Sequence, residues 1–252
     1  MAHNPIHGAT PDFQAFVSNK FANLDRSSNL NGFVNLDLLR RRTIWWPTWK
    51  GWLLLLVIFV APVSVWAWFG EAFLLRTGRI AADTLVVESW IQPDGLHAAA
   101  AEYRSGGYRH LVVTGGLTGS KGTSRRRSYS ALAERELVAA GIGGDAIIAA
   151  ETPDVDNQRT YVMAVSVRDV LQARGIRPAG LNIFTAGAHA RRSRLVYAKV
   201  FAPEVDVGVI TWTAWDRTSN VPWWRSSERT LELIKETLAY TYEFLFSSGR
   251  RS

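Results

Sequence analysis

Residues 84–90 read TLVVESW, a short run that is apolar up to Val87 and turns polar at Glu88. A strand with one face in water alternates apolar and polar residues, whereas a strand buried on both faces of a parallel sheet is continuously apolar. The run therefore predicts a buried strand of a parallel sheet. Four more runs of this kind follow it, at 110–114 (HLVVT), 146–149 (AIIA), 181–185 (LNIFT) and 205–211 (VDVGVIT).

Helical patterns separate these runs along the chain. They cover residues 93–105, 125–140, 157–174 and 190–201, and a last helix is expected near 228–246. Strict alternation of strand and helix is typical of a doubly wound α/β fold, because right-handed crossovers place helices on both faces of a parallel sheet. We therefore expect one α/β domain over residues 80–248, with a mostly parallel, five-stranded sheet.

An uncharged apolar stretch precedes the first strand. Residues 51–70 read GWLLLLVIFVAPVSVWAWFG, which matches the length that a helix needs to cross the hydrocarbon core of a membrane. Tryptophans gather at both ends, as is common where aromatic rings lie at the two headgroup levels. Pro62 lies inside the run, a position that membrane helices tolerate better than soluble ones. We expect residues 44–75 to be one transmembrane helix with its flanks.

The charges beside this run indicate its direction in the membrane. More basic residues precede it than follow it: Arg40, Arg41, Arg42 and Lys50 come before, Arg76 and Arg79 after. Because basic residues are enriched on the cytoplasmic side, we expect residues 1–43 to be a flexible cytoplasmic tail and the α/β domain to be extracytoplasmic. The chain is thus expected to be a single-pass protein of the inner (plasma) membrane. A cleaved signal peptide and a buried core helix are the two competing interpretations.

Composition excludes some chemistries. The chain has 252 residues, a formal net charge of +7 and no cysteine. Disulfides, thiol nucleophiles and Cys-ligated metals are therefore excluded. We expect no nucleic-acid partner, because the domain lacks the dense basic stripe with interleaved aromatic residues that such proteins carry. We expect no metal either, because His97, His110 and His189 lack ligand partners at useful spacings.

Candidate site residues follow from the rule that ligands bind at the carboxyl ends of the strands in open α/β sheets. The residues at or just after these ends, or at the start of the next helix, are Glu88, Gly115, Gly116, Arg159, Thr160, His189, Arg191 and Arg192. Guanidinium groups near helix N-termini, beside glycines that let backbone N–H groups approach a ligand, are typical of a pocket for phosphate or another anion. We expect Glu88 and His189 to be catalytic and the other six residues to bind the ligand.

Several of these residues also have a purely structural interpretation. The glycine pair at 115–116 fits a tight turn, since it is neither a P-loop nor a GxGxxG motif. His189 fits a helix cap. Glu88 ends a buried strand, where an unpaired carboxylate is costly, so it is either paired with an arginine or used in chemistry. The Trp pair at 223–224 fits either stacking on a sugar or acyl chain or a packing cover.

Four segments carry a resemblance to a known family: ADTLVVESW at 82–90, HLVVTGG at 110–116, DNQRTYVMA at 156–164 and TAGAHARRSR at 185–194. Over residues 82–211 the chain resembles the YdcF-like family, also called domain of unknown function 218. This family includes the ElyC and SanA envelope proteins. The H-x-R-R element at 189–192 is the most specific part, and TGG stands where the family usually has Ser-Gly-Gly. The resemblance implies a Rossmann-like three-layer sandwich, frequent N-terminal membrane anchoring, and a role in cell-envelope or surface-polysaccharide biogenesis.

Topology and pocket together lead to a functional hypothesis. The space outside the cytoplasm supplies no ATP, NAD or S-adenosylmethionine, so we expect no cofactor and a phosphate-bearing ligand, either a lipid carrier, a lipid-linked sugar or an exported glycan. In an enzymatic version His189 transfers a proton and Glu88 orients it or acts as base. The alternatives are a non-catalytic scaffold or regulator of a polysaccharide-synthesis complex, and a cytoplasmic nucleotide-binding domain.

Overall fold

The computed structural model describes residues 46–118, 127–215 and 221–246, so the tail predicted over 1–43 lies outside the described residues. Within them, one sheet of parallel strands has the order β3-β2-β1-β4-β5. The strands are β1 (Thr84–Glu88), β2 (His110–Gly115), β3 (Ile147–Glu151), β4 (Gly180–Ala186) and β5 (Asp206–Trp212). The predicted α/β fold with a five-stranded parallel sheet is confirmed.

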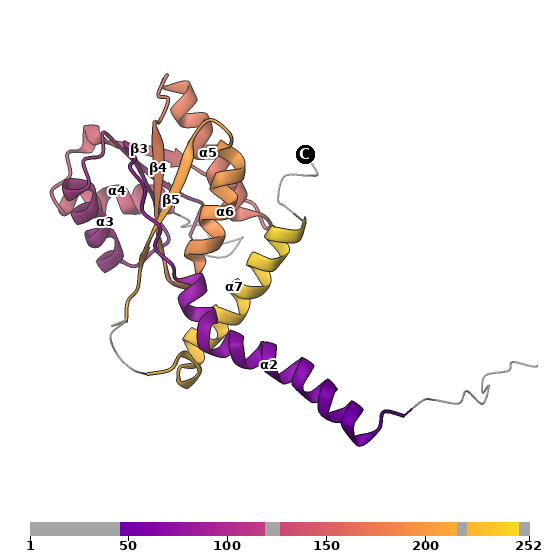
Figure 1. The fold of residues 1–252 in the computed structure, drawn as a ribbon. Coiled ribbons are helices and arrows are strands. Elements are labelled where there is room, and N and C mark those ends of the chain that lie inside the picture. The colour runs from indigo at the N-terminus through magenta and orange to yellow at the C-terminus, as the bar shows by residue number, and fades with distance from the viewer. Residues whose placement is uncertain (1–45, 119–126, 216–220, 247–252) are drawn as a thin grey trace, which may run out of the picture. The chain divides into compact units, whose positions relative to one another are not determined.

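Helices cover both faces of the sheet, which makes three layers (Figure 1). One face carries α3 (Pro93–Ser105) and α4 (Tyr129–Ala139), and the other carries α5 (Arg159–Ala173) and α6 (Ala190–Phe201). Leu85 and Val87 of β1 point into the core under α3 and α4, while Val86 points into the core under α5 and α6. Since successive side chains of a strand alternate between its faces, burial of both faces explains the uninterrupted apolar run.

The strand order reverses between β1 and β4. From β1 the chain moves outward through β2 to β3, and it then returns to place β4 and β5 on the other side of β1. At such a switch point the two crossovers leave in opposite directions, and in open α/β sheets this is where ligands usually bind, outside the carboxyl ends of the two central strands. The short helix η2 (Gly187–His189) follows β4 at this edge and leads into α6.

The apolar run of the sequence lies in α2 (Trp49–Leu74), a 26-residue helix that continues through Pro62. Among the described residues it is the one helix long and apolar enough to cross a membrane. Only 6% of its most apolar 18-residue stretch is buried, whereas the core helix of a soluble protein is mostly buried. The exposed surface of α2 therefore does not fit the interpretation as a core helix.

The carboxyl-terminal end of α2 is part of the domain's packing. Leu74 and Leu75 are buried together with Ala188 of η2 and with Leu233 of α7 (Ser227–Phe246). An ion pair joins Arg229 of α7 to Glu71 of α2. In η3 (Trp223–Arg225), the indole N–H of Trp223 donates to the carbonyl of Ala67 at 2.8 Å, so at least one of the paired tryptophans has a packing role.

The segment between α2 and β1 is bonded to the edge of the sheet. Gly78 forms an isolated antiparallel bridge with Val209 of β5, in which each backbone N–H donates to the other's carbonyl, at 2.9 and 3.1 Å. The buried side chain of Asn182 in β4 accepts from the N–H of Ile80 and donates to its carbonyl. This connection is therefore held by the sheet.

Candidate functional site

The centre of the candidate site is the carboxylate of Glu88, the last residue of β1. It is fully buried, at 0% exposed. The hydroxyl of Thr185 in β4 donates to its Oε2, and the hydroxyl of Ser193 in α6 lies 3.0 Å from both carboxylate oxygens. These bonds compensate for much of the cost of removing a carboxylate from water. The partners of Glu88 are thus hydroxyl groups and a histidine, so the first of the two alternatives from the sequence, a pair with an arginine, is not what the structure has, and the second, a use in chemistry, stays a prediction.

That histidine is His189, the last residue of η2, which is 9% exposed. Its Nε2 lies 3.6 Å from Oε2 of Glu88, and its Nδ1 lies 3.2 Å from Oε1 of Glu236 in α7. The ring of Trp90 packs against it nearly edge to face, with centroids 5.1 Å apart. His189 occupies the N-cap position of α6, but its side chain forms no capping hydrogen bond. The imidazole therefore lies between two carboxylates, with a proton acceptor on either side.

Arg192 holds this histidine in place. Its Nε and Nη2 donate to the two oxygens of Glu236 at 2.7 and 3.1 Å, and its Nη1 donates to the hydroxyl of Thr160 at 2.9 Å. Its Nη2 also lies 2.8 Å from Nδ1 of His189. An arginine has about five N–H donors, and Glu236 and Thr160 together accept from three of them. Arg192 is thus mainly a support for the imidazole.

Glu236 is held in its ionised form. Burial of this carboxyl opposes ionisation, but the hydrogen bond and the charge of His189, together with those of Arg192, outweigh it and lower the pKa of Glu236 well below its usual range. The carboxylate and the guanidinium form a bidentate pair, the geometry that fixes orientation best. A charged pair in this position holds the Nδ1 side of His189.

The backbone of η2 is tied to α7 by a second glutamate. The carboxylate of Glu232 accepts the N–H of Ala188 at 2.8 Å, and burial raises the pKa of this carboxyl. Gly187 has φ +59°, a conformation that favours glycine, and a Cβ there would collide with the carboxylate of Glu232. The turn that presents His189 therefore depends on a glycine at 187.

The structure brings four of the eight predicted site residues together: Glu88, Thr160, His189 and Arg192. Thr160, at the start of α5, is 4% exposed, and its hydroxyl lies 3.5 Å from Nε2 of His189. Their sequence separation is large, but Glu88 ends β1 and the other three follow β3 or β4, all at the same edge of the sheet. Whether they act on a ligand stays a prediction.

The other four predicted residues have different surroundings. The guanidinium of Arg191 lies 3.7 Å from the ring centre of Phe73 and donates to the carbonyl of that residue, in the last turn of α2. Arg159 is exposed and donates to the carbonyl of Val155. Arg191 thus stabilises the carboxyl end of the apolar helix, where unsatisfied carbonyls favour a cation. Binding of an anion by Arg159 and Arg191 stays a prediction.

The two glycines after β2 differ from each other. A Cβ at Gly115 would lie 2.8 Å from Cβ of Tyr129, the first residue of α4, so this glycine allows close packing of the helix. A Cβ at Gly116 would meet nothing within 4 Å. Gly116 therefore borders open space, while Gly115 has a packing role as well.

Three residues of the cluster were not among the candidates from the sequence: Thr185, Ser193 and Glu236. Ser193 comes four residues after His189 and so shares its helix face, which is a weak signal because serine is common. Glu236 is the larger surprise, since it belongs to a helix that follows the last strand. No rule about strand ends points to it.

Tyr197 lies in the core beside this cluster. It is fully buried, and its hydroxyl has no hydrogen-bond partner among the described residues. Burial and the nearby negative charge of Glu88 raise the pKa of this phenol well above its usual value. The side chain therefore stays neutral.

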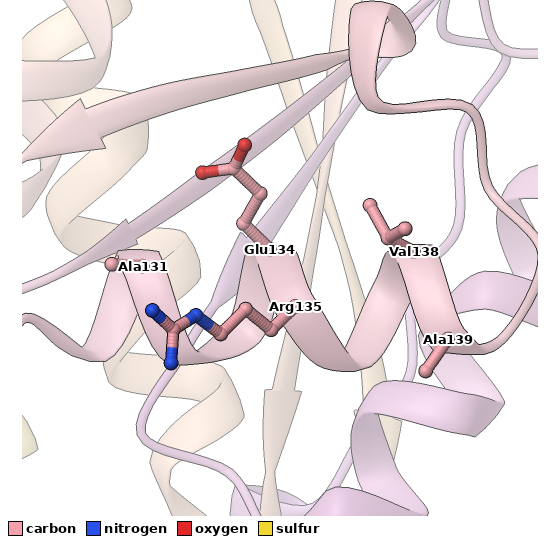
Figure 2. Close-up of a pocket in the computed structure, with 5 residues that line it drawn as sticks. All are labelled: Ala131, Glu134, Arg135, Val138 and Ala139. Atoms are coloured by element: carbon pink, nitrogen blue, oxygen red, sulfur yellow. The ribbon is translucent and has the colours of Figure 1, made fainter.

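The part of the chain that the structure describes contains no group of three or more His, Cys, Asp or Glu residues that could hold a metal. An open depression lies on the outer face of α4, and Figure 2 shows its lining side chains, all from that one helix: Ala131, Glu134, Arg135, Val138 and Ala139. Ligand sites usually combine polar groups from several elements. This depression offers no such convergence, and it includes none of the cluster residues.

Comparison with known proteins adds no assignment to this geometry. No family model matches the chain, and neither a curated protein nor a solved structure matches it. The chemistry of the site must therefore be argued from its own residues.

Proposed function

We propose that the chain is a single-pass protein of the plasma membrane, with its α/β domain outside the cytoplasm, that binds a phosphate-bearing lipid carrier or lipid-linked sugar at the carboxyl edge of its sheet. One observation carries this proposal. Ala188, which immediately precedes His189, packs against Leu74 and Leu75 at the end of the apolar helix α2. The candidate site is thus built directly onto the end of the proposed span.

This attachment suits a lipid ligand better than a soluble one. The end of a spanning helix lies near the lipid headgroups, which is also the level of the phosphate of a membrane-bound carrier. Such a ligand would present its phosphate to His189 while its apolar chain stayed in the bilayer. For a water-soluble ligand, a site close to the lipid headgroups would offer no additional contact.

The proposed chemistry assigns separate roles to the cluster residues. His189 would donate or accept the proton at the phosphate-linked oxygen, since it is the titratable side chain with some exposure. Arg192 and Glu236 would act as positioning residues through their contacts with Nδ1. Phosphate oxygens would meet the exposed guanidinium of Arg159, at the N-terminal end of α5, and the open backbone at Gly116.

The packing of α2 also supports an uncleaved anchor. A signal peptide would be cut after Val65-Trp66-Ala67, which loosely resembles a small-residue cleavage site. The carbonyl of Ala67, however, accepts the indole N–H of Trp223, and Trp66 packs in the cluster around Leu74. Cleavage there would remove packing partners from the domain. A removable signal peptide has no need of such contacts.

The biological setting that we propose, biogenesis of the cell envelope or of a surface polysaccharide, comes from the resemblance to the YdcF-like family. The H-x-R-R element that carries it supplies His189, Arg191 and Arg192. Two of these meet Glu236, and the third caps α2. Each charged residue of the element therefore has a definite partner in the fold.

Binding of a polyprenyl phosphate to the full-length protein in lipid nanodiscs tests this proposal. The thermal midpoint of unfolding should rise with the polyprenyl phosphate but not with the corresponding polyprenol, because a ligand stabilises only the state that binds it. Inorganic phosphate forms a third arm, which separates a free anion from a lipid headgroup. Equal shifts with the phosphate and the alcohol would overturn the proposal.

Two variants localise the effect. Arg159→Gln should reduce the shift in midpoint, whereas Arg168→Gln should not, because Arg168 lies on the same helix but pairs with Asp169 on the surface. An equal loss in both variants would indicate general electrostatic attraction rather than a site.

A second candidate function is a cytoplasmic nucleotide-binding domain. The strand order β3-β2-β1-β4-β5 favours it, because the first five strands of dinucleotide-binding folds have this order and the dinucleotide binds at the crevice between β1 and β4. A pair of C-terminal topology reporters separates the two functions, one active only outside the cytoplasm and one fluorescent only inside. Fluorescence inside would favour the nucleotide and exclude the lipid carrier.

A further inference from the structure

The last helix, α7, has its polar and apolar faces reversed with respect to an ordinary surface helix. Glu236 and Glu243 are 2% and 3% exposed and pair with Arg192 and Lys199 of α6. A surface helix normally turns its apolar stripe to the core and its charges to water. Two charges of α7 thus face the domain, and its apolar side is left facing outward.

The outward side of α7 is a continuous apolar stripe. Its members recur every three or four residues and are 51–70% exposed: Leu231, Ile234, Leu238, Tyr242 and Leu245. The helix has 20 residues and is therefore about 30 Å long. Among its exposed residues from Leu231 onward, all of them described, Lys235 carries the only charge. Monomeric soluble proteins rarely leave so long an apolar surface in water.

This stripe continues onto the exposed end of α2. Trp224, just before α7, packs edge to face against Trp68 of α2, with ring centroids 6.0 Å apart. Both rings remain exposed, at 48% and 74%. In the proposed span, Trp68 lies near the headgroup level, where tryptophan is enriched. The stripe therefore starts at that level.

The contacts between α2 and α7 indicate that the two helices cross. Glu71 contacts Arg229, and Phe73 packs against Tyr240 with ring centroids 5.5 Å apart. Glu71 and Phe73 are about 3 Å apart along the axis of α2, whereas their partners Arg229 and Tyr240 are about 16 Å apart along the axis of α7. Since contacts so far apart on α7 meet neighbouring turns of α2, α7 runs across the end of α2 rather than alongside it, and a helix that lies across an upright span is close to the plane of the membrane.

We propose that α7 lies in the headgroup region of the bilayer, with the stripe from Leu231 to Leu245 buried among the lipids. This inference rests on the membrane span of the proposed function. Lipid is the occupant that fits, because the stripe begins beside Trp68 of the proposed span and so continues an apolar surface that already lies in the bilayer. Lys235 beside the stripe is suited to reach the phosphates of the headgroups.

The chain's lack of cysteine makes a direct test possible. Single cysteines at Leu238 in the stripe, Val57 in α2 and Val138 on α4 are labelled with a fluorophore in the full-length protein, in nanodiscs that contain nitroxide-bearing lipids. All three positions are exposed, so labelling should not disturb the fold. We expect the labels at 238 and 57 to lose most of their emission and the label at 138 to keep it.

The outcomes separate this inference from the proposed function. Quenching at 57 without quenching at 238 overturns the interfacial helix and leaves the span intact. Quenching at neither position overturns the span, and the lipid-carrier function with it. A label at 238 that escapes lipid quenching while the same cysteine forms a disulfide with a second copy assigns the stripe to a dimer, which also overturns the inference.

Discussion

At the scale of single residues, the Glu236–Arg192 pair couples stability to pH. Folding lowers the pKa of Glu236 from its ordinary value of 4.5, so the pair adds stability that is fully present above that value and is lost as the pH falls further. Glu236→Gln should destabilise the protein at neutral pH by about 3 kcal/mol, because it leaves Arg192 without its partner. The difference between variant and wild type should shrink on acidification, when the wild-type carboxyl is protonated as well.

Thermal unfolding in detergent at a series of pH values measures this difference. The raised pKa of Glu232 acts in the opposite direction, but it is present in both proteins and largely cancels. Glu228→Gln, at an exposed position in the first turn of the same helix, is the control and should show little effect. A penalty for Glu236→Gln that stays constant with pH would contradict the assignment of a charged pair.

Two buried tyrosines provide a matched test of hydrogen bonding. Tyr197→Phe removes a hydroxyl with no partner among the described residues, so it should leave stability unchanged or raise it by about 1 kcal/mol. Tyr108→Phe removes a hydroxyl that donates to Glu102 at 2.8 Å and accepts from Asn182 at 3.1 Å, so it should lower stability by about 1 kcal/mol. The midpoints of unfolding of the two variants measure both effects. A loss at Tyr197 as large as that at Tyr108 would indicate a bonded phenol.

At the scale of elements, the strands were the most predictable part of the fold. The five apolar runs match β1 to β5 to within two residues at each end, because burial on both faces leaves few alternatives to Val, Ile and Leu. The helices between them follow from the alternation. The start of α4 is the exception: it begins at Tyr129, whereas the pattern predicted residue 125, which lies outside the described residues.

The candidate site was predictable only in part, for the same physical reason. Strand ends and their following turns point to Glu88, Thr160, His189 and Arg192, since topology alone brings them to one edge. Glu236 comes from a helix whose docking depends on long-range packing, and the apolar spacing of that helix gives no warning that its charges face inward. Sequence periodicity locates an amphipathic face but does not say which face meets the domain.

The junction of η3 with α2 provides a prediction at this scale. Trp223→Phe keeps an aromatic ring but removes the indole N–H that donates to the carbonyl of Ala67. Amide hydrogen exchange in the last turns of α2 should become faster, because the lost hydrogen bond joins these turns to η3 and restrains their local opening. Trp224→Phe should have little effect. Trp224 is 48% exposed, and among the described residues its side chain makes ring contacts, which phenylalanine can keep, but no hydrogen bond. Unchanged exchange in Trp223→Phe would mean that the junction is held by apolar packing alone.

At the scale of the whole molecule, replacing the anchor separates a binding site from a scaffold. Residues 1–65 are exchanged for the N-terminal tail and the first part of the span of an unrelated single-pass protein. The packed end of α2, from Trp66 onward, is kept. The proposed ligand-binding function should survive, because all contacts of the cluster lie in the retained part. The shift in unfolding midpoint with polyprenyl phosphate measures it. Retained binding with loss of function in the cell would instead support the scaffold hypothesis.

The bonded connection between α2 and β1 determines how the domain can meet its ligand. Gly78 and Ile80 are bonded to β5 and β4, so the segment between α2 and β1 does not act as a flexible linker. The domain therefore stays close to the end of α2 and to the membrane surface. On the proposed topology, every encounter then takes place by lateral diffusion within one bilayer. The rate of encounter depends on the number of carrier molecules per unit area of membrane. Diluting the carrier with inert lipid should therefore slow binding, even when its bulk concentration is held constant.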